Sequence, residues 1–419
     1  MQTNQRAISP LLWVMLFDHT SLNITFPVLT LLFFDVQSSL FAADTSHAVR
    51  SMWYGLCISA PNIVNIFVTP LLSALSDGFG RKKLIFLGAM GAFVFAVTAA
   101  FGILWGSLSV LFYSCVLRGA FSRTNPIAQA VIGDIAPSHK KVLYMGYLQT
   151  AISIGAFIGP VMGGYFASPF FFTQLNFSLP FFIAGIFAFI SCILTLTIFT
   201  ETLIQRRTTS PWREFHWQPL KKVFSRPAVL RISAILLLSQ ISWSMYYQFM
   251  PPILKTVMHV DSHQLGVFVG LIALWLALAT TFGIRFLDQL FTMQQMLLLS
   301  LYLVLLGTVS TAMFFLWHLT GPYTFLIWLA AIPTAVGDVI AFSCITALYS
   351  DVVAKEEQGK VMGICFIVVA FIWSLTAMLG GMFLSIDPLL PLMVAPVGIL
   401  FAIGLVHSEF WQKTLAVSA

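Results

Sequence analysis

Long apolar stretches separated by short polar loops make up most of the sequence. An α-helix needs about 20 apolar residues to cross the hydrocarbon core of a bilayer. Twelve stretches of this length run over residues 11–34, 52–75, 84–105, 109–133, 143–167, 179–200, 229–253, 264–286, 295–317, 322–349, 359–384 and 389–407. The pattern predicts an all-α membrane protein with twelve transmembrane helices and both termini on one side of the membrane.

The polar segment 204–227 interrupts this pattern between the sixth and seventh stretches. It is rich in arginine and lysine and contains Pro211 and Pro219. We interpret it as a linker between two six-helix bundles, residues 1–203 and 228–419. A repeat supports this division, because the same spacing separates Asp134, Met145-Gly146 and Gly163-Gly164 in one half and Asp351, Met362-Gly363 and Gly380-Gly381 in the other. Parallel repeats of this kind build two bundles around a site near the middle of the membrane.

Composition and charge support the same class. The chain is 59% hydrophobic and 9% charged, whereas an ordinary soluble domain is about 25% charged. Arginine and lysine are concentrated near 81–83, 140–141 and 206–226, on the side of the N-terminus, and the opposite side carries Arg50 and Lys255. This asymmetry predicts that both termini are cytoplasmic. The net charge of +6 follows from it, so we expect no nucleic-acid partner.

Nothing in the sequence indicates an enzyme or a metal protein. The five cysteines fall inside predicted helices at unrelated spacings, where they are small apolar packing residues. The HExxH, GxSxG, Walker and CxxC patterns are absent from the sequence. We therefore expect no metal and no cofactor.

The fifth predicted helix has a face without side chains. Gly155, Gly159 and Gly163 recur every four residues and share one side of the helix. Such a face lets a neighbouring backbone approach closely in a bilayer, and Pro160 removes a backbone donor and bends the helix. Tight helix packing is the simplest interpretation. The stretch also resembles the antiporter motif of proton-driven exporters in the major facilitator superfamily, matched at Gly146, Gly155, Gly159, Pro160, Gly163 and Gly164.

A second motif lies between the second and third helices. Asp77 precedes Gly78, Gly80 and the basic run Arg81-Lys82-Lys83. The positive-inside rule accounts for the basic run but not for the aspartate. The loop resembles the conserved loop of the same superfamily, which implies a conformational latch formed by Asp77, Gly80 and Arg81, with Asp134 and the glycine face as further gating elements.

Ionisable residues inside apolar spans are costly and indicate function. Here they are Asp18, His19, Arg118, Arg123 and Asp338. The resemblance places all five on helices that line a central cavity. Asp18 begins the segment DHTSLNITFPVLTLLF, which resembles the first helix of tetracycline/proton antiporters, so we expect Asp18 to couple protons. Asp338 lies near the middle of the tenth span after Pro333 and Gly337, where the helix can loosen, and is the second proton-coupling candidate. The alternatives are an Asp18 carboxylate near the headgroups, a structural Asp338, and a His19 packed between helices.

Polar and aromatic stripes give candidate substrate contacts. Arg118, Ser122, Asn125 and Gln129 lie on one face of the fourth span, and Arg123 lies off it. Which arginine corresponds to the one that the family carries on this helix is left open. The seventh span offers Gln240, Trp243, Tyr246 and Tyr247, a cluster suited to a flat or aromatic substrate.

The resemblance implies a transporter of the bacterial cytoplasmic membrane that works as a monomer by alternating access. We expect it to export a small organic molecule in exchange for protons. The alternative is a proton-coupled importer of a nutrient, organic acid or siderophore or other metal chelate. The expected partners are the substrate, protons and the lipid bilayer.

Overall fold

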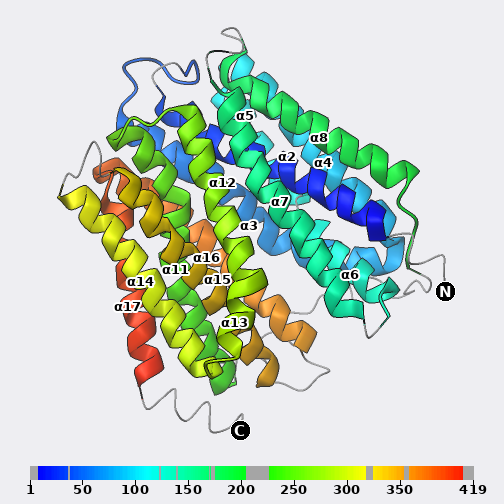
Figure 1. Ribbon diagram of the computed structural model, residues 1–419. Helices are drawn as coiled ribbons and strands as arrows, with labels where there is room; N and C mark the ends of the chain where they lie inside the picture. Colours follow the sequence, from blue (N-terminus) through cyan, green and yellow to red (C-terminus); the bar gives the residue numbers. More distant parts are fainter. Residues whose placement is uncertain are drawn as a thin grey trace. The chain divides into compact units, whose positions relative to one another are not determined.

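The computed structural model describes residues 8–35, 38–121, 124–137, 140–168, 170, 175–203, 226–317, 324–352 and 358–408. Within these residues every regular element is a helix (Figure 1). The prediction of an all-α membrane protein is therefore confirmed. The chain divides into two compact units, and each is described by itself below.

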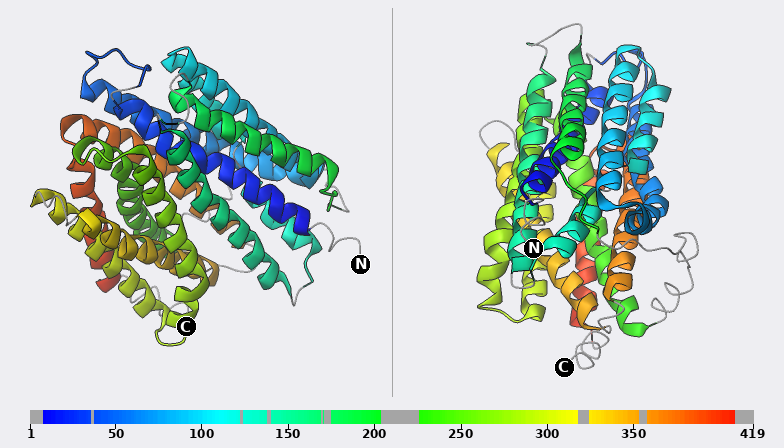
Figure 2. Two further views of the ribbon diagram at one scale, coloured as in Figure 1. Left: turned by 45° about the horizontal axis from the view of Figure 1, so that its top comes forward. Right: turned by 90° about the vertical axis from the view of Figure 1, so that its right-hand side faces the viewer.

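Unit 1 contains Met1–Phe215 and Leu254–Leu274. Its helices are α2 (Ile8–Phe34), α3 (His47–Phe79), α4 (Arg81–Leu104), α5 (Leu108–Phe121), α6 (Thr124–Ile135), α7 (Lys141–Phe166), the short 3₁₀ turn η2 (Asn176–Ser178) and α8 (Leu179–Thr197). Helix α2 lies along both α7 and α8, and α4 lies along α5 and α8 (Figure 2). This arrangement makes α2 the most buried helix surface of the unit, with seventeen buried residues.

Unit 2 contains His216–Ile253 and Trp275–Ala419. Its helices are most of α11 (Pro227–Val257), the end of α12 (Ser262–Leu278), the π-helical turn η3 (Ala279–Gly283), α13 (Ile284–Asp288), α14 (Met293–Leu316), α15 (Phe325–Asp351), α16 (Gln358–Ile386) and α17 (Leu390–His407). Helix α14 packs against α15 and α17. The last turn of α11 and the first half of α12 belong to unit 1. Residues 204–225 of the predicted linker lie outside the described residues.

Ten helices in the described part of the chain are long and apolar enough to cross a membrane. Helix α2 is long enough as well, but Asp18, His19 and Asn23 lower its mean hydropathy. The predicted fourth span is present as two helices, α5 and α6, on either side of Ser122 and Arg123, which lie outside the described residues. The protein is a multi-pass membrane protein.

The glycine face of α7 lies directly against the backbone of α2. A methyl group on Gly155 would stand 2.8 Å from the Leu16 carbonyl oxygen, and one on Gly159 would stand 2.8 Å from that of Thr20. A methyl group on Gly163 would collide with the Ile24 carbonyl oxygen. Because backbone lies on backbone along this line, any side chain at these positions would separate the two helices.

The repeated face in unit 2 uses a different chemistry. Helix α16 carries Thr376 and Gly380 where α7 carries Gly159 and Gly163. The Ser244 hydroxyl of α11 donates to the Thr376 hydroxyl at 2.8 Å, and the Phe249 ring occupies the space above Gly380. The two halves thus share a helix pairing, but unit 2 fills it with side chains.

We predict that Gly159→Leu destabilises the protein, because α2 leaves no room for an isobutyl group. Overpacking of this kind costs about 1–3 kcal/mol or more. The measurement is thermal unfolding of the purified, detergent-solubilised protein. Gly146→Leu is the matched control, since nothing lies within 4 Å of a methyl group on Gly146 in the same helix. Equal melting temperatures for the two variants would contradict the packing described here.

Candidate functional site

Asp18 is a buried carboxylate in the middle of α2. Its side chain accepts a hydrogen bond from the Thr124 hydroxyl of α6, and the residue is 1% exposed. It lies ten residues after Ile8, the start of α2, which is about 15 Å along the helix axis. One turn further along, the Ser21 hydroxyl donates to the Ala184 carbonyl oxygen of α8 at 2.8 Å. The structure thus joins α2 to α6 and α8 through polar contacts at this level.

Arg118 contacts the backbone of α2 beyond Asp18. Its Nη2 donates to the Leu22 carbonyl oxygen at 3.3 Å, and its guanidinium carbon stands 5.4 Å from the centre of the Phe95 ring. Leu22 is one helical turn beyond Asp18, about 6 Å along the axis. The guanidinium therefore reaches the same stretch of α2 from the fourth span.

The rest of the predicted polar stripe is only partly described. Ser122 and Arg123 lie outside the described residues. On α6 the Gln129 amide donates to Asn125 Oδ1 at 3.3 Å. His19 has a buried Nε2 atom with no hydrogen-bond partner in the part of the chain that the structure describes, and its Cβ faces Gly155. This environment matches the interpretation of His19 as a residue packed between helices.

Asp338 occupies the interior of unit 2. Its Oδ1 accepts from Gln240 Nε2 of α11 at 3.2 Å, and Gln240 Oε1 accepts from the indole nitrogen of Trp373 at 2.9 Å. Asp338 is 7% exposed and Gln240 is 3% exposed. Three helices, α11, α15 and α16, therefore meet in one hydrogen-bonded chain, which runs from buried Asp338 and Gln240 to the partly buried Trp373.

Four stacked or tilted aromatic side chains adjoin this hydrogen-bonded chain. We call them the aromatic wall: Trp373, Tyr247, Trp243 and Tyr246. The Trp373 and Tyr247 rings are 5.9 Å apart, and Tyr247 stacks on Trp243 at 5.4 Å. Trp243 also stacks on Tyr246 at 6.5 Å. The structure thus brings together the four residues predicted on the seventh span with Asp338. Sequence reasoning missed Trp373, although a buried indole N–H needs an acceptor and so indicates a polar neighbour.

The loop between α3 and α4 is held by two acidic residues. Arg81 Nε stands 3.1 Å from Asp134 Oδ2 at the end of α6. The Glu201 carboxylate accepts the backbone N–H groups of Arg81 and Lys82 at 3.0 and 3.2 Å, as well as those of Thr202 and Leu203. Glu201 thus caps the N-terminus of α4, where N–H groups lack helical partners and favour negative charge.

Gly80 is required by this capping arrangement. Its φ angle is +104°, and a methyl group on it would collide with the Glu201 carboxylate. Asp77 lies in α3, and its side chain is outside the described part of the chain. Arg81 and Asp134 are therefore brought together as neighbours, and Glu201 joins them from the end of the sixth span.

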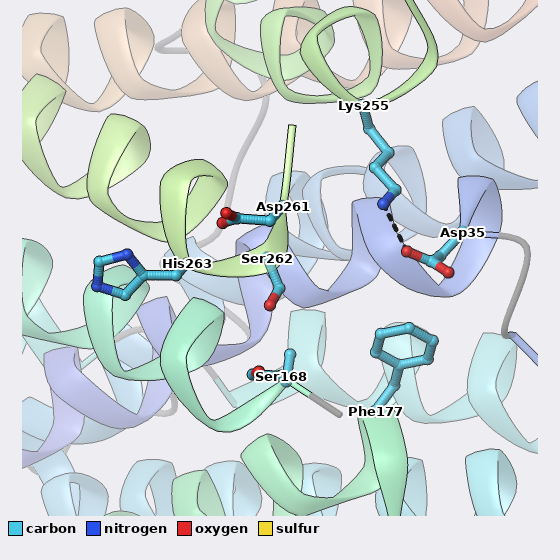
Figure 3. Close-up of a pocket in the computed structure, with 8 residues that line it drawn as sticks. Asp35, Ser168, Phe177, Lys255, Asp261, Ser262 and His263 are labelled. Carbon is cyan, nitrogen blue, oxygen red and sulfur yellow. Dashed lines mark ion pairs between the residues drawn. The ribbon is translucent and has the colours of Figure 1, made fainter. Parts of the chain in front are cut away.

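A pocket lies where α2 and α7 end, away from the loop between α3 and α4. Figure 3 shows the residues that line it. Its volume is about 300 Å³, and an ion pair of 2.5 Å between Lys255 Nζ and Asp35 Oδ2 crosses one side. The residues that line it are Asp35, Ala167, Ser168, Phe177, Lys255, Asp261, Ser262 and His263. The Asp261 carboxylate accepts the backbone N–H of Gln264 at 2.7 Å and caps α12. The ion pair ties the end of α2 to the last turn of α11.

Within unit 1, the first half of α12 makes a second close backbone contact with α7. A methyl group on Gly266 would stand 2.8 Å from the Gly164 Cα atom, and one on Gly270 would stand 2.9 Å from the Phe157 carbonyl oxygen. The spacing of four between Gly266 and Gly270 is visible in the sequence and indicates such a face. Helix α7 therefore carries backbone contacts on two sides, towards α2 and towards α12.

Comparison with known sequences identifies the family. The sequence profile of the Major Facilitator Superfamily matches residues 11–378. The chain belongs to the Major Facilitator Superfamily. This membership makes it a transporter and not an enzyme, as the sequence predicts.

Two curated relatives of this superfamily member are named for drug resistance. The tetracycline resistance protein, class H, of Pasteurella multocida is 25% identical over 197 residues, 47% of this chain and 45% of its own length. The quinolone resistance protein NorA of Staphylococcus aureus (strain MRSA252) is 28% identical over 187 residues, 42% of this chain and 44% of its own length. Each match thus spans less than half of the relative.

Solved structures of other transporters share the fold. The D-xylose-proton symporter has a TM-score of 0.74 at 15% identity, with 98% of each chain covered. The human organic anion transporter MFSD10 (TETRAN) has a TM-score of 0.68 at 15% identity, covering 96% of this chain and 99% of its own. At this identity the likeness concerns the fold alone.

Glu201→Gln should destabilise the loop after α3. A glutamine keeps one acceptor oxygen but turns an NH₂ donor towards backbone N–H groups, and loss of a helix cap costs about 0.5–2 kcal/mol. Thermal unfolding of the purified transporter measures the effect. Lys83→Gln removes an exposed charge from the first turn of α4 and should change the stability by less than about 0.5 kcal/mol. A Glu201→Gln variant as stable as Lys83→Gln would show that the cap contributes nothing.

The Asp35–Lys255 pair should show strong coupling in a double-mutant cycle. The two side chains are 17% and 16% exposed, so removing one partner leaves a poorly solvated charge and should cost about 1–3 kcal/mol. Asp35→Asn and Lys255→Gln are the single variants, and the double variant should be more stable than their summed effects predict. Additive changes in melting temperature would mean that the two charges do not interact.

Proposed function

We propose that this transporter exports a small organic molecule from the cytoplasm in exchange for protons. In this proposal it resides in a bacterial cytoplasmic membrane with both termini in the cytoplasm. The observation that carries the proposal is the contact between the glycine face of α7 and α2, the helix that holds Asp18. The face that resembles the antiporter motif thus lies on the helix of the main proton-coupling candidate.

This contact supplies a physical route for coupling. Because the two backbones are in direct contact, α2 and α7 move as one body. A displacement of α2 at Asp18 therefore displaces α7 as well. A neutral carboxyl is much cheaper to remove from water than a carboxylate. Protonation of Asp18 therefore favours the conformation in which the carboxyl is excluded from water and hydrogen-bonded to Thr124. Deprotonation favours a conformation in which the carboxylate is hydrated. The guanidinium of Arg118, one turn away along α2, is the proposed electrostatic partner.

The names of the relatives support a drug-like substrate. One is named for resistance to tetracycline and the other for resistance to quinolones, and both words denote small organic molecules with flat ring systems. The aromatic wall of unit 2 suits such rings. We assign substrate contacts to Gln240, Trp243, Tyr246 and Tyr247 in unit 2, to Arg118, Asn125 and Gln129 in unit 1, and to Ser122 and Arg123 outside the described residues. Asp338 is the second proton-coupling candidate.

The capped loop after α3 is the proposed conformational latch. Arg81 is paired with Asp134 and bonded through its backbone to Glu201. All three residues belong to unit 1, so these contacts fix the loop within that unit, and in this proposal the loop held in this way favours the outward-open state. Asp77 and the α7 segment with Gly155, Gly159, Pro160 and Gly163 complete the gating set.

Asp18→Asn should abolish transport driven by a pH gradient. The variant carries a permanently neutral side chain, so the proton no longer distinguishes the two states. The pH-driven accumulation of a tetracycline or a quinolone in everted vesicles should fall at least tenfold, about the factor that 1.4 kcal/mol of coupling supplies. Exchange of labelled drug across the membrane without a gradient should persist. Asp44→Asn, at an exposed loop position, is the matched control and should transport normally.

Two outcomes would overturn parts of this proposal. Full pH dependence in the Asp18→Asn variant would remove Asp18 as the coupling group and make Asp338→Asn the next variant to measure. Accumulation of substrate in right-side-out vesicles, and not in everted ones, would replace export by proton-coupled import.

A further inference from the structure

The amide of Gln240 has only one orientation that satisfies both of its neighbours. The Trp373 indole nitrogen is a donor and never an acceptor, so the atom 2.9 Å from it must be the amide oxygen. The amide nitrogen then points at Asp338 Oδ1, 3.2 Å away. The indole thus fixes the donor-to-acceptor direction of both hydrogen bonds: Trp373 donates to Gln240, and Gln240 donates to Asp338.

Because of this direction, the two hydrogen bonds of Gln240 depend on whether Asp338 is protonated. A carboxylate accepts the amide N–H in a charge-assisted bond, which is about twice as strong as a neutral one. A protonated carboxyl is a weaker acceptor and carries an O–H donor that is best paired with the amide oxygen. That oxygen is already used by Trp373. Protonated Asp338 therefore brings a second donor to the Gln240 oxygen, which weakens its bond to the Trp373 indole.

Of the groups joined by these hydrogen bonds, the Trp373 indole is the one that can move when Asp338 is protonated. The Gln248 amide donates to the Trp373 carbonyl oxygen at 3.3 Å, and Ser244 donates to Thr376 one turn further along α16. These contacts hold the backbone of α16 against α11 on the same face. A change at Gln240 is therefore absorbed by the Trp373 side chain, which lies against Tyr247 in the aromatic wall.

We propose that Gln240 is a positioning residue that transmits the protonation state of Asp338 to the Trp373 indole and thereby reshapes the aromatic wall. The inference rests on the proposed function in one respect: the wall is where a flat substrate is expected to bind. Trp373 then acts as a substrate-contacting residue whose position depends on the proton. Binding of substrate and binding of the proton become linked within unit 2.

Other ionisable groups face the same region and must be separated from Asp338. The helices packed around α15 carry Arg231, Tyr246 and Tyr247 on α11, Tyr302 on α14 and Cys365 on α16, and α15 itself carries Cys344 and Tyr349. Arginine, tyrosine and thiol side chains ordinarily keep their protons below pH 8. Arg285 and Asp288 are exposed beyond the π-helical turn, and His407 lies at the end of α17 against Tyr302. His407→Gln therefore belongs among the controls.

The test follows the fluorescence of Trp373 in the full-length protein in lipid nanodiscs between pH 5 and pH 8, without any ligand. The chain has 11 tryptophans, so the Trp373 component is the difference between each protein and its own Trp373→Phe counterpart. In the wild type this component should change with pH along a single titration curve. The change should be lost in Asp338→Asn and in Gln240→Leu, which removes both hydrogen bonds at similar size. It should persist in Ser244→Ala and His407→Gln.

Gln240→Asn provides a second variant if Gln240→Leu does not fold. Its amide is one methylene shorter and cannot span both partners, so the same loss is expected. A pH-dependent Trp373 component that survives unchanged in Gln240→Leu or Gln240→Asn would overturn the relay, as would its absence from the wild type. The measurement needs no transport. A protein that shows the relay but fails to export drug in vesicles would overturn the proposed function and leave this inference intact.

Discussion

The close approach of α7 to α2 is the constraint on which unit 1 depends. In a bilayer no hydrophobic gain is available for pairing two helices, so their association rests on packing and on polar contacts. Three glycines remove every side chain from the contact line, and the carbonyl oxygens of Leu16, Thr20 and Ile24 occupy the space. With α2 fixed in this way, its polar residues face α6 and α8, where Asp18 meets Thr124 and Ser21 meets Ala184.

The two units solve the same packing problem in different ways. Where unit 1 has bare backbone, unit 2 has the Ser244–Thr376 hydrogen bond and the Phe249 ring over Gly380. Their buried carboxyl groups differ too, since Asp18 is held by a hydroxyl and Asp338 by an amide. A hydroxyl can donate to a carboxylate or accept from a protonated carboxyl simply by rotating. An amide that is locked by a second partner cannot, so the two carboxyl groups respond to a proton with different structural consequences.

The sequence predicted the fold well because membrane spans are recognised from local composition. Repeated glycines at a spacing of four also predicted a close helix contact, which the structure shows between α7 and α2. The partners of the buried polar groups were not predictable in this way. Thr124 is distant from Asp18 in the chain, and Gln240 is distant from both Asp338 and Trp373, so the local pattern does not show which of these residues pair. The role of Glu201 as a cap of α4 was not predictable either, because it depends on how the segment after α8 returns to that helix.

The π-helical turn at Ala279–Gly283 affects how this chain can be compared with its relatives. A π turn closes its hydrogen bonds over one more residue than an α turn. A relative with an uninterrupted α-helix in this span needs one residue fewer to cover the same length, although both helices look continuous. The correct alignment then contains a gap of a single residue inside an apolar helix, where gaps are normally penalised. Without that gap, every residue of α13 is matched to a position about 100° around the helix.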